Sequence, residues 1–314
     1  MTAEGWARVS TDAFNLALFA YLAGMLAAFH HLAFRRRSVW ALSIGLATLG
    51  AAAHLVSLVG RGLAAERIPL GNMYEYSLAL SFLVVVAYLV VVEALAKVRT
   101  LGGFVLAFAT VTMAIAALFL HVGPAPLVPA LNSYWRQIHV GSMIVSSSLL
   151  ALGSVVTILY LVKDARERRT ALPPIAGGST DLRVEEGAPH DLVPDADEAA
   201  PALARSRGWL PPAEALDQLA YRLLAFAFPI WTFGIVTGAI WAQEAWGRYW
   251  GWDPKETWSF ITWVVFAGYL HARATSGWRG RRAAVIALIG FVSLLITYYA
   301  VNLWIVGLHS YAGV

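Results

Sequence analysis

The chain has 314 residues, of which 59% are hydrophobic and 13% are charged, and its mean hydropathy is +0.63. A soluble domain carries about 25% charged residues, so this composition excludes an ordinary soluble protein and predicts one embedded in a lipid bilayer. The net charge of +4 gives no reason to expect a nucleic-acid partner, because basic residues gather in the cytoplasmic loops of membrane proteins. No cysteine is present, so a metal ion would need His, Met or carboxylate ligands.

Eight apolar segments follow one another along the chain, each long enough to cross a bilayer as a helix. They cover residues 13–34, 39–60, 73–96, 102–121, 139–162, 217–242, 254–273 and 282–306. The first segment lacks the basic leader and the cleavage site of a secretory signal peptide. The sequence therefore predicts an all-α, polytopic membrane bundle of about eight transmembrane helices.

The basic residues predict how these helices are oriented. Alternate connections hold Arg35 to Arg37, Lys97 and Arg99, the 163–169 cluster and the 273–282 cluster, whereas the other connections hold only scattered charges. Because Lys and Arg collect on the cytoplasmic side, both termini and the loop at about 243–258 should face outside. The Ala, Arg and Gly content is typical of a bacterial source, so we expect the bacterial cytoplasmic membrane, with this loop on the periplasmic side.

One long segment separates helices one to five (residues 1–163) from helices six to eight (residues 213–314). Residues 164–212 read as a disordered cytoplasmic linker, since most of this segment is rich in Pro, Gly, Ala and acids without periodicity. Residues 211–222, where the linker ends and the second group of helices begins, have the pattern of a short amphipathic helix lying at the membrane interface before span six.

The most unusual stretch is WGRYWGWDPKETW at 246–258. Asp253 as N-cap, Pro254 at the first helical position and Glu256 at the third predict a capping box that starts span seven. A single aromatic ring here would be explained by the interfacial aromatic belt. Rings packed this densely instead predict a platform for a planar aromatic ligand. The platform rings are Trp246, Tyr249, Trp250, Trp252 and Trp258.

A second outer loop, IPLGNMYEYS at 68–77, repeats this construction. Asn72 is a candidate N-cap, and Glu75 follows three residues later, which predicts another capping box. Helix capping alone is the simpler interpretation of this motif. Two aromatic-tipped loops on one face nevertheless suggest one composite outer pocket.

The histidines indicate which ligand such a pocket would take. His139 opens span five and His309 follows span eight, so both are expected outside. Two imidazoles flanking an aromatic platform can supply both axial ligands to a haem iron, although each alone reads equally as an interfacial residue hydrogen-bonded to a neighbour. Nearby, Arg61, Arg67, Arg136 and Arg248 can hold haem propionates or reach lipid phosphates, and the sequence leaves both open.

His271 lies near the cytoplasmic end of span seven, where an ionisable group is a functional candidate. His54, in span two, lies about 15 residues from its cytoplasmic end, or roughly 22 Å outward. This difference in depth argues against one iron shared by the two. A haem ligated by His271 would then take its second histidine from another subunit.

The Trp-rich stretch resembles the "WWD" signature, WGxxWxWDxKE, of the haem-handling proteins of cytochrome c maturation. Further segments resemble the CcsA (ResC) branch: IPLGNMYE at 68–75, the outer His139 after a tryptophan, YLHAR with His271, and GLHSY with His309. The resemblance covers most of the chain, and the signature is long and specific. CcmF members have many more spans, and CcmC lacks the long linker. Pro254 fills the variable position of the signature.

The resemblance implies one half of a System II cytochrome c synthase, a haem lyase, working with a CcsB (ResB) partner. Such complexes are thought to carry haem b through the membrane and present it to apocytochrome c, whose Cys-x-x-Cys-His motif forms two thioether bonds with the haem vinyls. His139 and His309 then resemble the outer axial ligands, and the Trp-rich loop, with Asp253, the haem platform. His271 resembles the CcsA half of an intramembrane haem site completed by the partner.

Under this interpretation the site positions its reactants and needs no catalytic nucleophile, because the thiols arrive on the substrate. The main alternative class is electron transfer by a membrane cytochrome with bis-His ligation. A haem exporter without synthase activity is the second alternative, and the sequence cannot separate it from a synthase. A structural scaffold would leave the tryptophans unexplained.

Overall fold

The computed structural model describes residues 1–96, 98, 100–127, 131–170, 210–305 and 307–308, and in these residues all regular structure is helical. The predicted all-α bundle is confirmed. In chain order the elements are α1 (Ala3–Phe34), α2 (Arg37–Ala65), α3 (Met73–Ala87), the π-helical η1 (Tyr88–Leu95), α4 (Gly102–Phe119), α5 (Tyr134–Thr170), α7 (Ala213–Trp246), α8 (Pro254–Thr275), α9 (Arg281–Leu295), the π-helical η4 (Ile296–Ala300) and α10 (Val301–Trp304).

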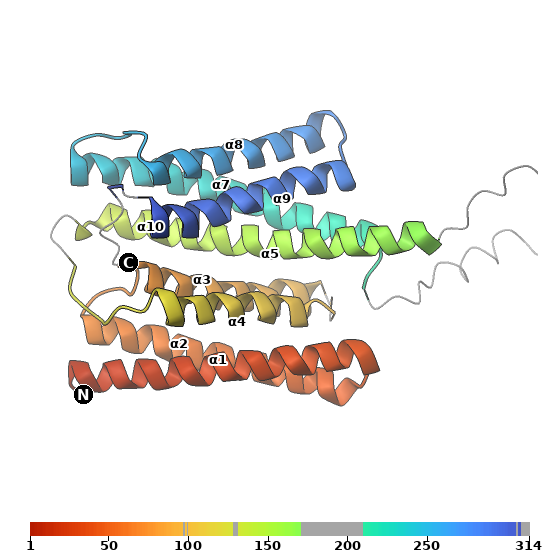
Figure 1. The fold of residues 1–314 in the computed structure, drawn as a ribbon, viewed down its shortest axis with the longest axis horizontal. Coiled ribbons are helices and arrows are strands. Elements are labelled where there is room, and N and C mark those ends of the chain that lie inside the picture. The colour runs from red at the N-terminus through yellow and green to blue at the C-terminus, as the bar shows by residue number, and fades with distance from the viewer. Residues whose placement is uncertain (97, 99, 128–130, 171–209, 306, 309–314) are drawn as a thin grey trace, which may run out of the picture.

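Among the described residues, seven helical units are long and apolar enough to cross a membrane. They are the α3–η1 unit, the α9–η4–α10 unit and the single helices α1, α2, α4, α5 and α7. The one predicted span that is not among them is the seventh, which corresponds to α8; its 22 residues include Lys255, Glu256, His271 and Arg273. It still runs alongside α9 within the bundle (Figure 1).

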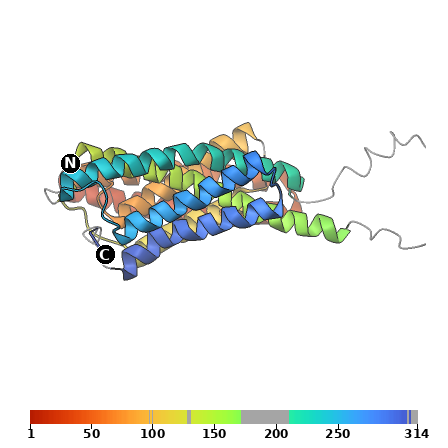
Figure 2. The ribbon, with the colours of Figure 1, turned by 90° about the horizontal axis from the view of Figure 1, so that it is seen from above.

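The helices lie side by side along one axis, so the molecule is an elongated bundle (Figures 1 and 2). α5 runs through its middle: it packs against α3 on one side and against α7 and α9 on the other. One apolar core fills the space between α1, α2, α3 and α4, and another fills that between α5, α7, α8 and α9. A third core joins the two halves across α5.

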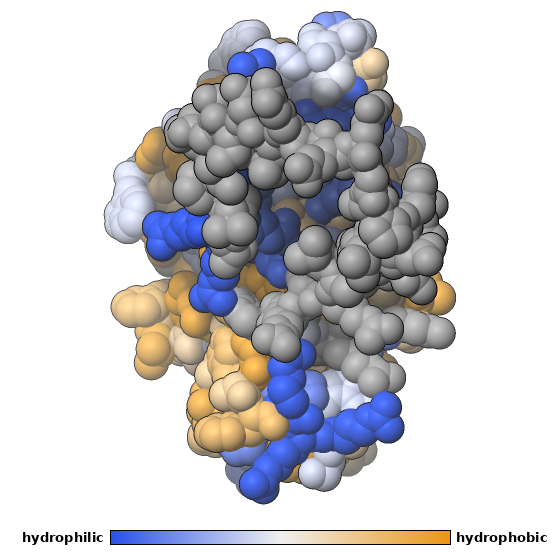
Figure 3. Space-filling model, turned by 90° about the vertical axis from the view of Figure 1, so that its right-hand side faces the viewer, coloured by the Kyte–Doolittle hydropathy of each residue, from blue (hydrophilic) through white to orange (hydrophobic). Residues whose placement is uncertain are grey.

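The two ends of the bundle differ in character. One end carries residues 247–253, the starts of α3 and α5 and the end of α10, and we call it the tryptophan end (Figure 1). The opposite end, the arginine end, presents hydrophilic side chains (Figure 3). Its exposed arginines are Arg35, Arg36, Arg37, Arg166, Arg168, Arg169, Arg279, Arg281 and Arg282.

Two predicted boundaries differ from the structure. α5 continues to Thr170, through residues placed in the linker, and Asp164 there pairs with Arg281 of α9. α7 is one helix of 34 residues, so residues 213–222 do not form a separate interfacial helix. The apolar face that suggested such a helix packs into the core through Leu216 and Leu223, which are buried. Residues 171–209, most of the predicted linker, lie outside the described residues.

Candidate functional site

A cavity opens at the tryptophan end between α3, α5, α7, α8 and η4. It holds about 1050 Å³ of space between its walls, part of it open to the surroundings. Residues 70–73, at the start of α3, and residues 246, 249 and 250, in the Trp-rich stretch, both line it. The composite pocket predicted from the two loops is therefore present.

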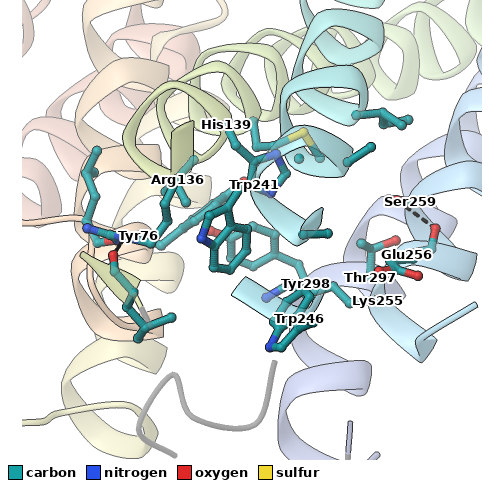
Figure 4. Close-up of a pocket in the computed structure, with 18 of the residues that line it drawn as sticks. Tyr76, Arg136, His139, Trp241, Trp246, Lys255, Glu256, Ser259, Thr297 and Tyr298 are labelled. Atoms are coloured by element: carbon teal, nitrogen blue, oxygen red, sulfur yellow. Dashed lines mark hydrogen bonds between the residues drawn. The ribbon is translucent and has the colours of Figure 1, made fainter. Parts of the chain in front are cut away.

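His139 lies in the cavity wall, on the second turn of α5 (Figure 4). Its Nδ1 is 2.7 Å from the backbone oxygen of Gly234 on α7. A carbonyl oxygen only accepts hydrogen bonds, so Nδ1 carries the proton and a neutral ring has its lone pair on Nε2. Histidines that ligate metals are commonly oriented by such a bond from the other ring nitrogen. The geometry therefore fixes the tautomer that can bind an iron through Nε2.

Gly238 on α7 makes room for this imidazole, and Gly234 one turn earlier makes room for Met143 of α5. Gly234 and Gly238 form a Gly-x-x-x-Gly pattern, which lets two membrane helices approach closely. The contact is tight, since a Cβ on Gly238 would lie 2.6 Å from Nδ1 of His139. Trp241, also on α7, has its ring nearly parallel to the imidazole, with centroids 5.9 Å apart. His139 is thus held between α5 and α7 in one orientation.

The aromatic wall continues from α7 into the Trp-rich loop. The rings of Trp241 and Trp246 have centroids 5.0 Å apart, and both line the cavity (Figure 4). α7 ends at Gly247, whose φ of +71° is the left-handed conformation that glycine adopts readily. The turn there leads to Tyr249 and Trp250, which also line the cavity. Three of the five predicted platform rings therefore face it.

The other two predicted rings do not line the cavity. Trp252 is 65% exposed, has a φ of +57° and packs edge-on against Trp250, with centroids 5.7 Å apart. It also contacts Phe260 on α8, so it supports Trp250 from outside. Trp258 is half-buried on the first turns of α8, away from the cavity wall.

The predicted capping box at the start of α8 is present. The carboxylate of Glu256 accepts from the backbone N–H of Asp253 at 3.1 Å and of Gly251 at 2.8 Å. Asp253 itself does not line the cavity. Its Oδ2 accepts from the Lys255 N–H at 3.3 Å, and its Oδ1 accepts from the Leu308 N–H at 2.7 Å. His309, the predicted second ligand, lies outside the described residues.

The second predicted capping box is only half formed. Asn72 caps α3 by accepting from the Glu75 N–H at 2.9 Å, as predicted. Glu75, however, accepts from the Gly71 N–H and pairs with two arginines, at 3.0 Å from Arg61 Nε and 2.7 Å from Arg67 Nη1. Its side chain is fully buried, so the carboxylate needs these cations to offset its lost hydration.

The cationic side chains on the cavity wall are Arg136 and Lys255. Arg136 is buried, and its Nη1 donates to the Leu70 oxygen at 2.7 Å, while Lys255 Nζ donates to Asn302 Oδ1 at 2.9 Å. The other arginines considered from the sequence are not on this wall: Arg61 and Arg67 pair with Glu75, and Arg248 packs over Gly251.

His271 lies far from the cavity. It is exposed on α8, towards the arginine end (Figure 1). Two residues along, Arg273 forms two hydrogen bonds with Asp217 of α7, at 2.8 and 3.0 Å, which fix this part of α8. His54 is fully buried, and it packs against Tyr21 of α1 and Phe82 of α3 on the other side of the bundle. The two histidines are therefore not neighbours, as their predicted depths indicated.

Several cavity residues were not predicted. Tyr76 of α3 and Tyr298 of η4 form part of its wall, with ring centroids 4.0 Å apart. Trp231 and Trp241 of α7 add two further indoles from within a predicted span. For the α7 side of the wall, the Gly-x-x-x-Gly pattern at 234–238 is a signal in the sequence, because it marks a close contact between helices.

The model of the family described as "Cytochrome C assembly protein" matches residues 70–309. Two similar proteins are named "Cytochrome c biogenesis protein CcsA". That of Gloeobacter violaceus is 40% identical, over 85% of this chain and 86% of its own, and that of Porphyra purpurea is 37% identical over 95% of both. The solved structure of "Cytochrome c Heme Lyase CcmF" has the same fold, with a TM-score of 0.66 at 15% identity over 95% of this chain. This chain spans about half (47%) of that protein.

Proposed function

This chain belongs to the CcsA family of cytochrome c assembly proteins, and from this premise we propose that it is the haem-presenting subunit of a System II cytochrome c synthase. It would hold haem b in the cavity at the tryptophan end, on the outer face of a bacterial cytoplasmic membrane. There an apocytochrome c would receive the haem through its Cys-x-x-Cys-His motif. A CcsB (ResB) subunit would complete the active complex.

One observation carries this proposal: a histidine of fixed tautomer in the wall of a cavity lined by aromatic rings. Nδ1 of His139 is committed to Gly234, so Nε2 is the nitrogen suited to an iron ligand. The indoles of Trp241, Trp246 and Trp250 offer the flat apolar surface that a porphyrin needs. Arg136 and Lys255 provide positive charge on the same wall, which suits the haem carboxylates.

His309 is the proposed second axial ligand of this outer haem. The residue before it, Leu308, is hydrogen-bonded to Asp253 in the Trp-rich loop. This contact of the preceding residue with the Trp-rich loop supports the choice of His309 as that ligand. One of the two imidazoles would leave the iron when the histidine of the substrate motif binds.

The proposed reaction requires this chain to position the haem vinyl groups and the thiols of the substrate. Each thiol adds across one vinyl double bond, with sulfur bonding to one carbon and the thiol hydrogen going to the other, so no external oxidant is consumed. The residues around the cavity would hold the porphyrin plane and exclude water, and positioning of this kind lowers the barrier by several kcal/mol. No nucleophile of this chain is required.

His271 is proposed as half of a second haem site within the membrane. It is exposed on α8, near the arginine end of the bundle, where the partner subunit can supply the other imidazole. An exposed ionisable side chain within a membrane helix favours a protein neighbour over lipid.

The test is the visible spectrum of the purified protein, with and without its CcsB-like partner, for the wild type and for His139→Ala, His309→Ala and His271→Ala. His30→Ala, at an exposed histidine on α1, is the matched control. We expect outer haem to depend on His139 and His309, and a co-expressed apocytochrome to receive it covalently. Haem that stays bound and never transfers would indicate a membrane cytochrome or an exporter. A protein that is colourless under every condition, and so binds no haem, would contradict the proposal.

A further inference from the structure

Two side chains at the start of α8 form hydrogen bonds with residues near the C-terminal end of the chain. Asp253 Oδ1 accepts from the Leu308 N–H at 2.7 Å, and Lys255 Nζ donates to Asn302 Oδ1 at 2.9 Å. We infer that Asp253 and Lys255 are positioning residues, which hold Leu308 and Asn302 at the start of α8, and that this anchoring is needed for His309 to act as the proposed ligand. This inference rests on the proposed function, because it concerns the second ligand of the proposed haem site.

The two oxygens of Asp253 have different tasks. Oδ2 caps α8 through the Lys255 N–H, and Oδ1 holds Leu308. The side chain is 7% exposed and does not line the cavity, so it has no place in contacting a ligand there. A serine is as good an N-cap as aspartate, but its single oxygen serves one of the two tasks. Capping and clamping can therefore be separated by substitution.

Gly307 provides independent support for a close fit. A Cβ on this residue would lie 2.7 Å from Asp253 Oδ1, closer than real Cβ atoms approach an oxygen. The backbone thus passes directly against the carboxylate, and a side chain at this position would push the two apart. Gly307 and Asp253 are therefore in close contact, and Gly307 lies two residues before His309 in the sequence.

Lys255 extends the clamp to the cavity wall. Lysine only donates, so it faces the Asn302 oxygen, and the Asn302 amide nitrogen is left to donate to the backbone oxygens of Tyr298, at 2.5 Å, and Thr297, at 3.4 Å. These two residues lie in η4 and line the cavity. The same motif that begins α8 therefore holds both η4 and the segment that follows it.

The experiment uses the full-length protein with its CcsB-like partner and follows the axial ligation of the outer haem by absorption spectroscopy. Asp253→Ser keeps the cap and removes the clamp, and Gly307→Ala disturbs the same contact from the other side. Gly123→Ala, in a loop where a Cβ would meet nothing within 4 Å, is the matched control. His309→Ala sets the reference spectrum.

We expect both clamp variants to show the spectral change of His309→Ala, and added imidazole to restore the wild-type spectrum in each. The double variant Asp253→Ser/His309→Ala should be no worse than His309→Ala alone. A wild-type spectrum in Asp253→Ser, or a loss that imidazole does not restore, would overturn the inference while His309 stays a ligand. An unchanged spectrum in His309→Ala would remove the proposed ligand and this inference together.

Discussion

Gly238 of α7 lies directly against the imidazole of His139, because a Cβ at this glycine would come within 2.6 Å of Nδ1. The Gly238→Ala substitution therefore adds one methyl group where the ring now sits. We expect His139 to be displaced from Gly234 and outer haem to be lost, as in His139→Ala. The measurement is the haem content of the purified protein. Gly45→Ala on α2, where a Cβ would meet nothing within 4 Å, should retain wild-type haem. Full haem content in Gly238→Ala would argue against His139 as a ligand held in this position.

The Trp-rich loop should divide into rings that bind haem and rings that do not. Trp246 lines the cavity, whereas Trp252 is 65% exposed outside it. We expect Trp246→Ala to weaken haem retention by roughly tenfold, the scale of about 1.5 kcal/mol for an aromatic contact. Trp252→Ala should retain haem. Titration of the apoprotein with haem measures both, and equal losses in the two variants would contradict this division.

The buried Glu75 should be a major source of stability. Its fully buried carboxylate compensates Arg61 and Arg67, whose side chains are 5% and 13% exposed. Glu75→Gln would leave two buried cations without their anion, so we expect the free energy of unfolding to fall by about 3 kcal/mol or more. Thermal unfolding in detergent measures this loss. Glu4→Gln, which breaks the exposed pair with Arg8, should change stability little. A small effect of Glu75→Gln would mean that water reaches the cluster.

The pair formed by Arg273 and Asp217 should affect the proposed inner haem alone. It joins α8 to α7 two residues from His271, with side chains 8% and 13% exposed. We expect Asp217→Ala to lower the haem that depends on His271 and to leave the haem that depends on His139. Spectra of the complex with the CcsB-like partner distinguish the two. Arg168→Ala, in a pair with a 64% exposed arginine, is the control. Loss of both haems would indicate a general loss of folding.

The sequence predicts the helices well because membrane-spanning backbone must satisfy its own hydrogen bonds, which ties hydropathy directly to helix position. The sequence does not decide between two structures when both produce the same hydrophobic pattern. The apolar face at 213–222 fits a membrane surface as well as a protein core, and only the packing of Leu216 and Leu223 decides between them.

The candidate site shows a similar limit. Sequence rules place Asp253 and Asn72 correctly as N-caps, because capping is local. They cannot tell that Glu75 turns to two arginines, since those partners come from other segments. Nor can they reveal that Tyr76 and Tyr298, from spans far apart in the chain, meet in one cavity wall. The direction in which Trp252 points is likewise set by tertiary packing.

The last membrane span, which contains the π-helical segment η4, should differ in how well it tolerates substitutions and deletions. It brings two consecutive residues, Thr297 and Tyr298, to the cavity wall, and the chain then continues to Asn302 and Leu308. Each residue of an α-helix turns the chain by about 100°. Deleting one residue from α10, the α-helix that follows η4, would rotate the residues beyond the deletion by that angle, and the contacts of Asn302 with Lys255 and of Leu308 with Asp253 would fail together. The end of this chain should therefore tolerate substitutions far better than a change in length, and the number of residues between Thr297 and His309 should be the same in every working relative.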